Sequence, residues 1–359
     1  MVSTLVSRAI QALGSCPLLS GIHTYSADIH DGQAHSQQVS CNTGFDGPKV
    51  DILNGTSYDF WYFEAVAYDG QSSVVVNFHA GAPLNSDLSG ERSSSSNNMQ
   101  LSGHFSNGTT FSEVITVDTA IVSTAGDGSN GLWGAEGDSW YSSPDMSDYR
   151  VELKAKEGSI RGSITMHSVA PAHYPCSLTR PGDSLEVMPG IGWVNAVPDA
   201  DVTVDLRIHG MPFKFLGIGY HDKGVTPFSD VVGSWNWGHA RMGPYSIVWL
   251  HSTDRGATTY SSGYVAYQGQ VVFAQCDGAI EIRTSNEDTD RSIANNSAFP
   301  DVFSLRIDLG GSHGVLEADL YPTQITLDTP TFTRWVGNVT GSAGESSWQG
   351  IVSGDFAIL

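Results

Sequence analysis

The chain has 359 residues, and its 17 Lys and Arg against 38 Asp and Glu give a formal net charge of −21 at pH 7. At roughly 150 residues per domain, this length favours two domains. An acidic chain without a basic cluster is not expected to bind nucleic acid, because a phosphate-backbone binder needs a positive surface. Hydrophobic residues make up 40% of the chain, enough for a large core. No apolar run reaches the ~18 residues that a membrane-spanning helix needs.

The first 20 residues lack the basic region and the uninterrupted apolar region of a signal peptide. We therefore expect either a protein that is not exported or a chain that follows a removed signal peptide. One short helix is predicted here, because Leu5, Ile10 and Leu13 share a helical face before Pro17.

Four cysteines have no CxxC spacing, which argues against a zinc or redox site: Cys16, Cys41, Cys176 and Cys276. They form either two disulfides or four buried thiols. Four asparagines head glycosylation sequons: Asn54, Asn107, Asn295 and Asn338. Together these features favour the secretory pathway, with the cytoplasm as the alternative.

The remainder of the chain predicts an all-β fold. Short β-like runs are broken by Gly, Asn, Asp and Pro. The predicted strands are Tyr58–Tyr68, Ser73–Phe78, Phe111–Val117, Tyr149–Ala155, Ser159–His167, Val202–His209, Tyr245–Leu250, Gly263–Tyr267, Gln270–Phe273, Val302–Asp308 and Val315–Tyr321. Turn dipeptides between them, such as Asp69-Gly70, are typical of hairpins. Loops are predicted at Ser86–Asn98 and Ala125–Gly137.

A domain boundary is predicted near Asp205–Pro212, because the polar, turn-like Asn195–Asp201 precedes it and the densest aromatic cluster follows it. We expect an N-terminal β-sandwich over residues 1–205 and a C-terminal β-barrel over residues 206–359.

Two familiar catalytic motifs are absent from the sequence: it has no HExxH pair and no P-loop. The loosely spaced His23, His30 and His35 are interpreted as exposed loop residues rather than metal ligands. We therefore expect neither a metal nor a cofactor.

The block Gly217–Trp249 is the most informative part of the chain. On a strand, alternate residues share a face. Trp235, Trp237, His239 and Arg241 then lie on one side, and this aromatic and hydrogen-bonding face suits a ligand cavity. The alternative is a packed core in which Arg241 pairs with an acid such as Asp222.

A second block, Tyr58–Tyr68, contains an acid within an apolar strand. Alternation puts Glu64 on the face of Tyr62 and Tyr68, opposite Trp61 and Phe63. Buried acids are rare unless they are paired or functional.

Asn77 and His79 share a face of the neighbouring strand. A pair of Glu64 with Arg241 or with His79 would be structural, and an unpaired acid would be functional. Near the C-terminus, Arg334-Trp335 begins a closing hairpin, in which Trp335 either caps a cavity or fills the core.

Several of these blocks together resemble a known family. They are Trp61-Tyr62-Phe63-Glu64-Ala65, Gly192-Trp193-Val194-Asn195 with Pro198-Asp199-Ala200-Asp201, Gly219-Tyr220-His221-Asp222, Trp235-x-Trp237-Gly238 and Gly243-Pro244-Tyr245-Ser246-x-Val248-Trp249. The sequence is similar over roughly residues 50 to 359 to the lipocalin-like hydroxyneurosporene synthase (carotenoid 1,2-hydratase) superfamily. Within it, the chain looks most like the fungal Diels–Alderases of secondary metabolism, which form decalins or join a terpene to a quinone methide.

The resemblance implies an N-terminal β-sandwich and a C-terminal lipocalin-like β-barrel with the substrate pocket between them. It also implies a stereoselective Diels–Alder or hetero-Diels–Alder cycloaddition without a cofactor. The expected substrate is a hydrophobic polyene, terpene or quinone-methide-like molecule. After Gly219-Tyr220-His221-Asp222 the chain departs from the family pattern with Lys223-Gly224-Val225-Thr226, which suggests a substrate different from the decalin precursors.

A cycloaddition needs two π systems held in one geometry, and a hydrogen-bond donor on a carbonyl accelerates it. Arg241, His239 and Lys223 are the predicted activating donors, and Glu64 is predicted to orient them or to act as an acid or base. The predicted aromatic walls are Trp61, Trp235, Trp237, Tyr245 and Trp335. Further predicted substrate contacts are Tyr68, Asn77, His221 and Asp222.

Two other functions fit the same residues. An alkene hydratase would use Glu64 or Asp222 to protonate a double bond. A non-catalytic lipocalin-like carrier would only bind a hydrophobic metabolite. The sequence makes no prediction of the oligomeric state.

Overall fold

The computed structural model describes residues 20–40, 43–54, 57–81, 96–154, 159–178, 182–225, 231–276, 278, 280–285 and 299–359. Every regular element within these ranges is a strand, so the all-β prediction is confirmed. In the same ranges, no helix has the length and hydropathy to cross a membrane. The predicted helix around Leu5, the cysteines Cys16 and Cys41, and most of the predicted loop Ser86–Asn98 lie outside the described residues.

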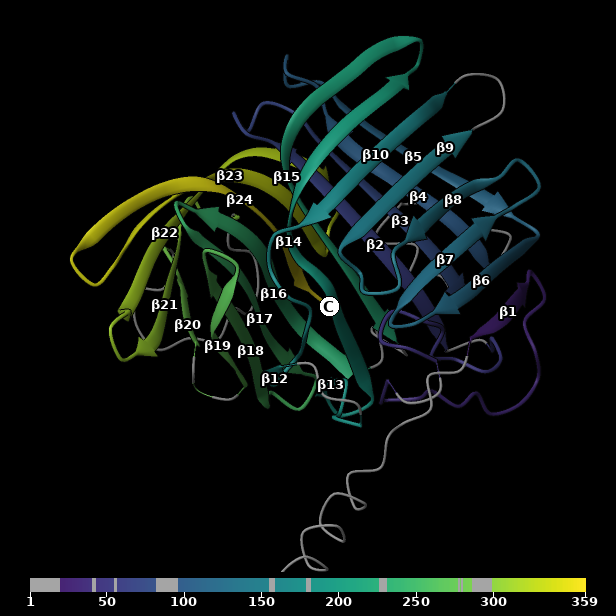
Figure 1. Ribbon diagram of the computed structural model, residues 1–359, viewed down its shortest axis with the longest axis horizontal. Helices are drawn as coiled ribbons and strands as arrows, with labels where there is room; N and C mark the ends of the chain where they lie inside the picture. Colours follow the sequence, from purple (N-terminus) through teal and green to yellow (C-terminus); the bar gives the residue numbers. More distant parts are fainter. Residues whose placement is uncertain are drawn as a thin grey trace, which may run out of the picture.

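The larger of two sheets is built from the N-terminal part of the chain (Figure 1). Among the described residues it has 15 strands, in the order β1-β6-β7-β8-β9-β10-β14-β15-β2-β3-β4-β5, with β11 and β13 paired to β14 and β12 paired to β11. Their bounds are β1 (Gly21–Ser26), β2 (Tyr58–Ala67), β3 (Ser73–Gly81), β4 (Asn97–His104), β5 (Thr110–Val117), β6 (Thr119–Ala125), β7 (Gly128–Trp133), β8 (Asp138–Ser142), β9 (Asp148–Lys154), β10 (Ile160–Ser168), β11 (His173–Tyr174), β12 (Ser177–Leu178), β13 (Glu186–Met188), β14 (Ile191–Ile208) and β15 (Met211–Val225). The sheet encloses a core that joins residues of distant strands, such as Phe63, Val76, Trp140 and Val151.

The smaller sheet is built from the C-terminal part. Its nine described strands follow the order β19-β18-β17-β16-β24-β23-β22-β21-β20 and are antiparallel throughout. Their bounds are β16 (Val232–Met242), β17 (Tyr245–Asp254), β18 (Thr259–Tyr267), β19 (Gln270–Cys276), β20 (Ile280–Thr284), β21 (Phe303–Gly310), β22 (Gly314–Asp328), β23 (Phe332–Ala343) and β24 (Ser346–Ile358). The sheet curls around its own core, so that Ile280 of β20 lies against Gly263 of β18.

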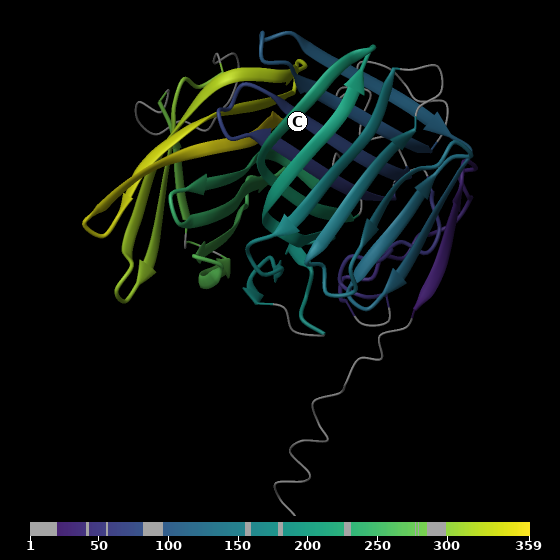
Figure 2. The ribbon, with the colours of Figure 1, turned by 45° about the horizontal axis from the view of Figure 1, so that its top comes forward.

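The two sheets lie side by side, with β14 and β15 next to the smaller sheet (Figures 1 and 2). A separate apolar cluster joins them, with Tyr62, Trp193 and Tyr220 from the larger sheet and Trp237 and Tyr264 from the smaller one. We call this region the junction.

Alternation along the strands decides which side chains reach the junction. On β2, Trp61, Phe63 and Ala65 pack in the core of the larger sheet, whereas Tyr62 packs in the junction cluster. This two-residue period is the expected property of a strand buried on both faces.

The predicted loops and boundary differ from the structure at two places. Gly128–Trp133, within the predicted loop Ala125–Gly137, is strand β7. A side chain at Gly131 would meet the ring of Trp140, and one at Gly128 would meet Ser142 and Ser143. Glycine here serves close packing rather than a turn.

Asn195–Asp201, predicted as a turn, lies inside β14. Its register against β15 shifts at Asn195/Val197 and Val197/Ala200, so bulges accommodate Pro198. The predicted division between residues 205 and 206 therefore falls within a strand. By sheet membership the change comes later, between β15 and β16. The turn after β14 is a two-residue hairpin with positive φ at His209 and Gly210.

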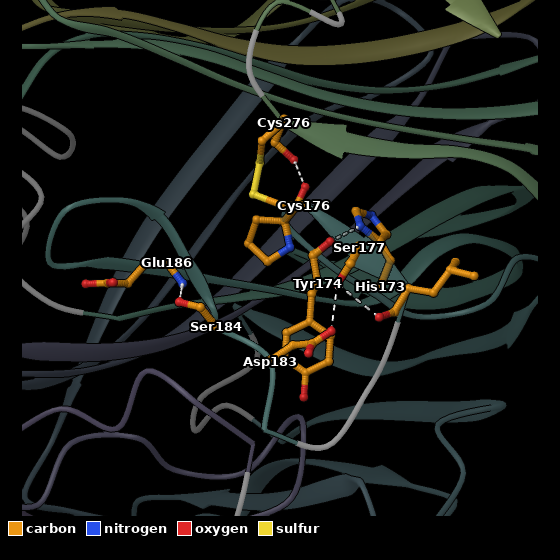
Figure 3. The surroundings of a disulfide bond; sticks show 11 residues. His173, Tyr174, Cys176, Ser177, Asp183, Ser184, Glu186 and Cys276 are labelled. Atoms are coloured by element: carbon orange, nitrogen blue, oxygen red, sulfur yellow. Dashed lines mark hydrogen bonds between the residues drawn. A yellow bond between two sulfur atoms is a disulfide. The ribbon is translucent and has the colours of Figure 1, made fainter. Parts of the chain in front are cut away.

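A disulfide bond also connects the two sheets. Cys176 lies between β11 and β12 of the larger sheet, and Cys276 ends β19 of the smaller sheet; their Cα atoms are 4.7 Å apart (Figure 3). Beside this bond, the ring of His173 stacks on Tyr264 with centroids 4.1 Å apart. The β11–β12 hairpin is thus held against the smaller sheet by a covalent bond and by ring stacking.

Candidate active site

Strand β16 presents one face to the larger sheet. Trp235 and Trp237 pack in the junction cluster, whereas Ala240 and Met242 pack in the core of the smaller sheet. The predicted common face of Trp235, Trp237, His239 and Arg241 is therefore present. It points at the other sheet rather than into the interior of its own.

Asp199 of β14 is the common partner of the polar side chains on the junction face of β16 and of Ser246. Arg241 donates to both its oxygens, Nε to Oδ2 at 2.8 Å and Nη2 to Oδ1 at 2.7 Å. Ser246 donates to Oδ2 at 2.5 Å, and His239 Nε2 lies 3.3 Å from Oδ1. The remaining guanidinium nitrogen, Nη1, donates to Asp201 Oδ1 at 2.6 Å. Bidentate contacts of this kind fix geometry strongly, so Arg241 holds the sheets together.

Glu64 lies on the other side of His239. It accepts hydrogen bonds from Tyr62 at 2.8 Å and from Ser353, and its Oε1 is 3.6 Å from His239 Nδ1. Burial opposes ionisation, but the contact with His239 lowers the pKa of Glu64. Burial also opposes the charge on His239, yet Asp199 and Glu64 raise its pKa. His239 therefore lies buried between two carboxylates, which favour its protonated form.

Asp222 of β15 has a different environment. Its Oδ2 accepts hydrogen bonds from Trp193 Nε1 at 2.7 Å and from the Tyr220 hydroxyl at 2.8 Å, whereas its Oδ1 has no partner. Burial outweighs these bonds and raises the pKa of Asp222 to about 7. A substantial fraction of Asp222 is therefore a neutral carboxylic acid near neutral pH, able to donate a hydrogen bond or a proton.

Aromatic rings surround this acid. Trp237 meets Tyr62 edge-on at 5.5 Å between centroids and Tyr220 at 5.0 Å, and Trp237 Nε1 has no hydrogen-bond partner. Behind Tyr62, the guanidinium of Arg334 lies 5.0 Å from its ring and pairs with Asp355. We call Tyr62, Trp193, Tyr220, Asp222 and Trp237 the Asp222 cluster. It combines an acid with rigid apolar walls.

Several predicted site residues meet at the junction. They are Glu64, Asp222, Trp235, Trp237, His239 and Arg241, with Asn77 on the same sheet face and Tyr68 at its edge. Tyr68 is 52% exposed and donates to Asp201 at 3.1 Å. Arg241 pairs with an acid, as one alternative predicted, but the acids are Asp199 and Asp201 rather than Asp222. Glu64 pairs with neither Arg241 nor His79 and lies beside His239 instead.

Three other predicted residues face the interior of the larger sheet, because they alternate with junction residues. Lys223 pairs with Asp59 and lies 4.4 Å above the ring of Trp61. His221 stacks on Phe63 at 4.0 Å. Lys223, His221 and Trp61 are fully buried and do not reach the junction, so we do not retain them as candidate site residues.

Two predicted aromatic walls belong to the core of the smaller sheet. Trp335 stacks on Phe303 with parallel rings 5.3 Å apart, and Tyr245 packs beside Tyr267. Of the two alternatives for Trp335, filling the core is the one observed.

Other junction residues received no role from the sequence, although Trp193, Tyr220 and Asp199 lie within the motifs of the resemblance. A local signal existed for Tyr220, since it is two residues from Asp222 and shares its strand face. No local signal connects Trp193 with Asp222, because that contact depends on the pairing of β14 with β15.

The described residues do not indicate a metal site. Among the described residues, no group of three or more His, Cys, Asp or Glu side chains is arranged to hold a metal ion.

Comparison with known proteins adds a family match. A family model described as Diels-Alderase-like matches residues 23–293. A quinolone epoxide rearrangement protein of Emericella nidulans is 33% identical over 81% of this chain and 80% of its own length. A Diels-Alderase of Chaetomium globosum is 29% identical over 68% of this chain and 56% of its own length.

Among solved structures, the crystal structure of CghA with Sch210972 superposes with a TM-score of 0.77 at 21% identity. The match covers 94% of this chain and 98% of CghA. At this identity the likeness establishes the shared fold.

Proposed function

The chain belongs to the Diels-Alderase-like family, an enzyme family of fungal secondary metabolism, and we propose that its junction binds a hydrophobic small molecule and catalyses a cycloaddition within it. The enzyme is of the pericyclase class, as its relatives named Diels-Alderase are. The observation that supports the junction as the site is the Asp222 cluster, where an acid whose pKa is raised by burial to about 7 lies among aromatic rings at the boundary of the two sheets.

In this proposal, Asp222 activates the electron-poor reactant. A protonated Asp222 can donate a hydrogen bond from its unpartnered Oδ1 to a carbonyl of the electron-poor reactant. This withdraws electron density from the adjoining double bond and lowers the barrier to cycloaddition. Because Trp193 and Tyr220 fix the other oxygen, the donor is oriented before the substrate arrives.

The rings supply orientation. Trp237 and Tyr62 offer flat, rigid surfaces that hold two π systems close together. Holding reactants in a near-attack geometry can contribute on the order of 7 kcal/mol to lowering the barrier. The Asp199–Arg241 and Glu64–His239 contacts support this surface by fixing β16 against the larger sheet.

The proposal is tested with purified protein and a panel of synthetic linear polyenes that carry a terminal carbonyl. We expect wild-type protein to accelerate cyclisation and to favour one stereoisomer, and Asp222→Asn to lose most of that acceleration. Equal rates and equal product ratios for the two proteins would reject the assignment of Asp222.

A second candidate function is an acid-catalysed epoxide rearrangement. The 33% identity to a quinolone epoxide rearrangement protein and the neutral Asp222 both favour it. In this reaction Asp222 protonates the epoxide oxygen, the C–O bond breaks, and the faces of Trp237 and Tyr62 stabilise the resulting cation. After a group migrates, a proton returns to the carboxylate, so no atom is gained or lost.

Solvent isotopes separate the candidates. Rate-limiting proton transfer to an epoxide slows in deuterated water, whereas a cycloaddition with one hydrogen-bond donor is nearly insensitive to it. A hydratase would incorporate oxygen from labelled water, and a carrier would bind its ligand without any rate enhancement.

We also propose that the protein matures in an oxidising compartment. The Cys176–Cys276 pair supports this, because such bonds persist mainly outside the cytosol. Alkylation of non-reduced protein from a fungal host, followed by peptide mass analysis, should find both cysteines linked. Two alkylated thiols would contradict the proposal.

A further inference from the structure

The hydroxyl of Tyr220 has two acceptors within hydrogen-bond distance. Its oxygen lies 2.8 Å from Asp222 Oδ2 and 2.6 Å from Asn195 Oδ1. A tyrosine hydroxyl has a single proton to donate. Tyr220 can therefore donate to Asp222 or to Asn195 at any moment, but not to both.

Strand pairing brings these three residues together. Tyr220 and Asp222 are two residues apart on β15 and share a face. Asn195 of β14 pairs directly with Asp222, at the first of the register shifts in β14. Asn195 and Tyr220 are fully buried, and Asp222 is nearly so. Water therefore competes little for the hydroxyl proton.

The bond from Tyr220 is what holds the amide of Asn195. Within the described residues, Asn195 Nδ2 is buried without a hydrogen-bond partner, and Oδ1 accepts from Tyr220. If the amide turned over, its nitrogen would face Tyr220 and its oxygen would take the place of Nδ2.

His173 opposes this turnover. It pairs with Asn195 across β11 and β14, and directly paired residues share a face. His173 Nδ1 donates to the carbonyl of Tyr174 at 2.8 Å, and burial lowers the pKa of His173 to about 3, which keeps the ring neutral. Nε2 is then an acceptor, because a neutral imidazole has one donor and one acceptor. An amide oxygen turned toward this acceptor would be repelled, so Oδ1 stays toward Tyr220.

The protonation state of Asp222 decides which acceptor receives the Tyr220 proton. A carboxylate is a stronger acceptor than an amide oxygen, so an ionised Asp222 takes the proton and leaves Asn195 Oδ1 buried without a donor. A neutral Asp222 leaves the proton to Asn195. Ionisation of Asp222 thus breaks the bond between Tyr220 and Asn195, and a buried acceptor without a donor is unfavourable.

Other titratable and charged groups also lie around Asp222. They are Tyr62 and Glu64 of β2, His173 of β11, Tyr220 and His221 of β15, His239 of β16, Tyr264 of β18, Arg334 of β23 and Asp355 of β24. Burial is the largest cause of the raised pKa of Asp222, and the charge of Asp355 adds to it. Bonds from Trp193 and Tyr220 and the charge of His221 act in the opposite direction.

We propose that Asn195 is a positioning residue that takes the Tyr220 proton and thereby keeps Asp222 protonated. It acts through Tyr220 and does not itself contact the reacting atoms. The inference rests on the proposed function, since Asp222 is the acid assigned there.

The test measures the ionisation of Asp222 without relying on turnover. Full-length protein with an isotope label at the aspartate side-chain carboxyl carbon is titrated by NMR, and the Asp222 signal is identified by its absence in Asp222→Asn. In Asn195→Leu, Tyr220 donates to Asp222 in both protonation states, and we expect the midpoint to fall by about one pH unit. In Tyr220→Phe that donor is lost, and the midpoint should rise by about one pH unit.

Two further variants guard against a general structural effect. Asn195→Ala removes the same acceptor without adding an apolar side chain, and its midpoint should also fall. Asn236→Leu is the matched control, because Asn236 is a buried asparagine that accepts a hydrogen bond from Trp249 in the smaller sheet. It should leave the Asp222 midpoint unchanged.

The double variant Asn195→Leu with Tyr220→Phe tests whether Asn195 acts through Tyr220. Its midpoint should equal that of Tyr220→Phe, because no hydroxyl proton remains to be shared. An equal fall with and without the Tyr220 hydroxyl would overturn the proposal, as would an unchanged or raised midpoint in both single variants of Asn195.

The pH profile of turnover separates this inference from the proposed function. In Asn195→Leu the decline of activity should move to lower pH by the same amount as the NMR midpoint. If the midpoint moves and the activity profile does not, the role of Asp222 in the reaction fails, while the control of its protonation by Asn195 stands.

Discussion

The two faces of strand β15 bury ionisable groups in opposite ways. Toward the interior of the larger sheet, Lys223 pairs with Asp59, and His221 lies 3.2 Å from Asp46. Toward the junction, Asp222 keeps one oxygen without a partner and holds a proton near neutral pH. Residues that are adjacent in sequence thus serve different purposes. The interior face pairs its ionisable groups, although burial lowers the pKa of Lys223, whereas the junction face leaves one oxygen of an acid available.

Breaking the interior pairing should have the largest effect. Lys223→Met leaves the Asp59 carboxylate buried without its countercharge, and we expect a loss of about 3–5 kcal/mol in the free energy of unfolding. Urea denaturation followed by fluorescence measures it.

The double variant Lys223→Met with Asp59→Asn should recover part of that loss, because no lone charge remains buried. A loss below about 1 kcal/mol in the single variant would place the pair in the class of weak surface ion pairs. The contrast between the two faces would then disappear.

Asp222→Asn is the corresponding change on the junction face. We expect kcat/KM to fall about 100-fold or more, because the acidic O–H donor is replaced by the much weaker N–H donor of an amide. In wild type, activity should decline as pH rises through about 7, where Asp222 loses its proton. The pH profile of the variant should lack this decline.

Stability should respond with the opposite sign to that of a paired acid. Because the pKa of Asp222 is raised in the folded state, its contribution to stability is present below the unfolded value of 3.8 and is lost as pH rises to about 7. Asp222→Asn should remove this dependence and leave the protein no less stable at pH 7. Asp205→Asn, at an exposed position of β14, is the control for both measurements.

Arg241→Ala tests the ion-pair contact between the two sheets. Loss of its bonds to Asp199 and Asp201 should lower the free energy of unfolding by about 2 kcal/mol. We expect the rate to fall less than in Asp222→Asn. Arg306→Ala, which breaks an exposed pair with Glu317, should change stability by no more than about 0.5 kcal/mol. A larger rate loss in Arg241→Ala than in Asp222→Asn would restore Arg241 as the activating donor.

Trp237→Phe should have the smallest effect on rate, less than about tenfold, because an aromatic surface remains. The ratio of stereoisomers should shift, as the indole sets the shape of the site. Trp335→Phe is the matched control in the core of the smaller sheet and should leave the ratio unchanged. A shift in both variants would mean that the ratio reports general loosening.

Much of the contrast between the two strand faces can be predicted from the sequence. Alternation on Tyr58–Tyr68 separated Glu64 and Tyr62 from Trp61, and alternation on β16 collected Trp237, His239 and Arg241 on one face. The same alternation separates His221 and Lys223 from Asp222, although the sequence motifs predict that all three contact or activate the substrate. His221 and Asp222 belong to one family motif and Lys223 directly follows it, but consecutive residues of a strand alternate between its two faces.

The sequence by itself determined the all-β class, the position of most strands and the faces that side chains share, because these depend on local periodicity and turn residues. Only the tertiary structure decided that Arg241 binds Asp199, that Trp193 binds Asp222 and that the β16 face meets the larger sheet. Those contacts join segments that are 29 and 42 residues apart. They depend on strand register, bulges in β14 and the packing of one sheet against another, which no local pattern encodes.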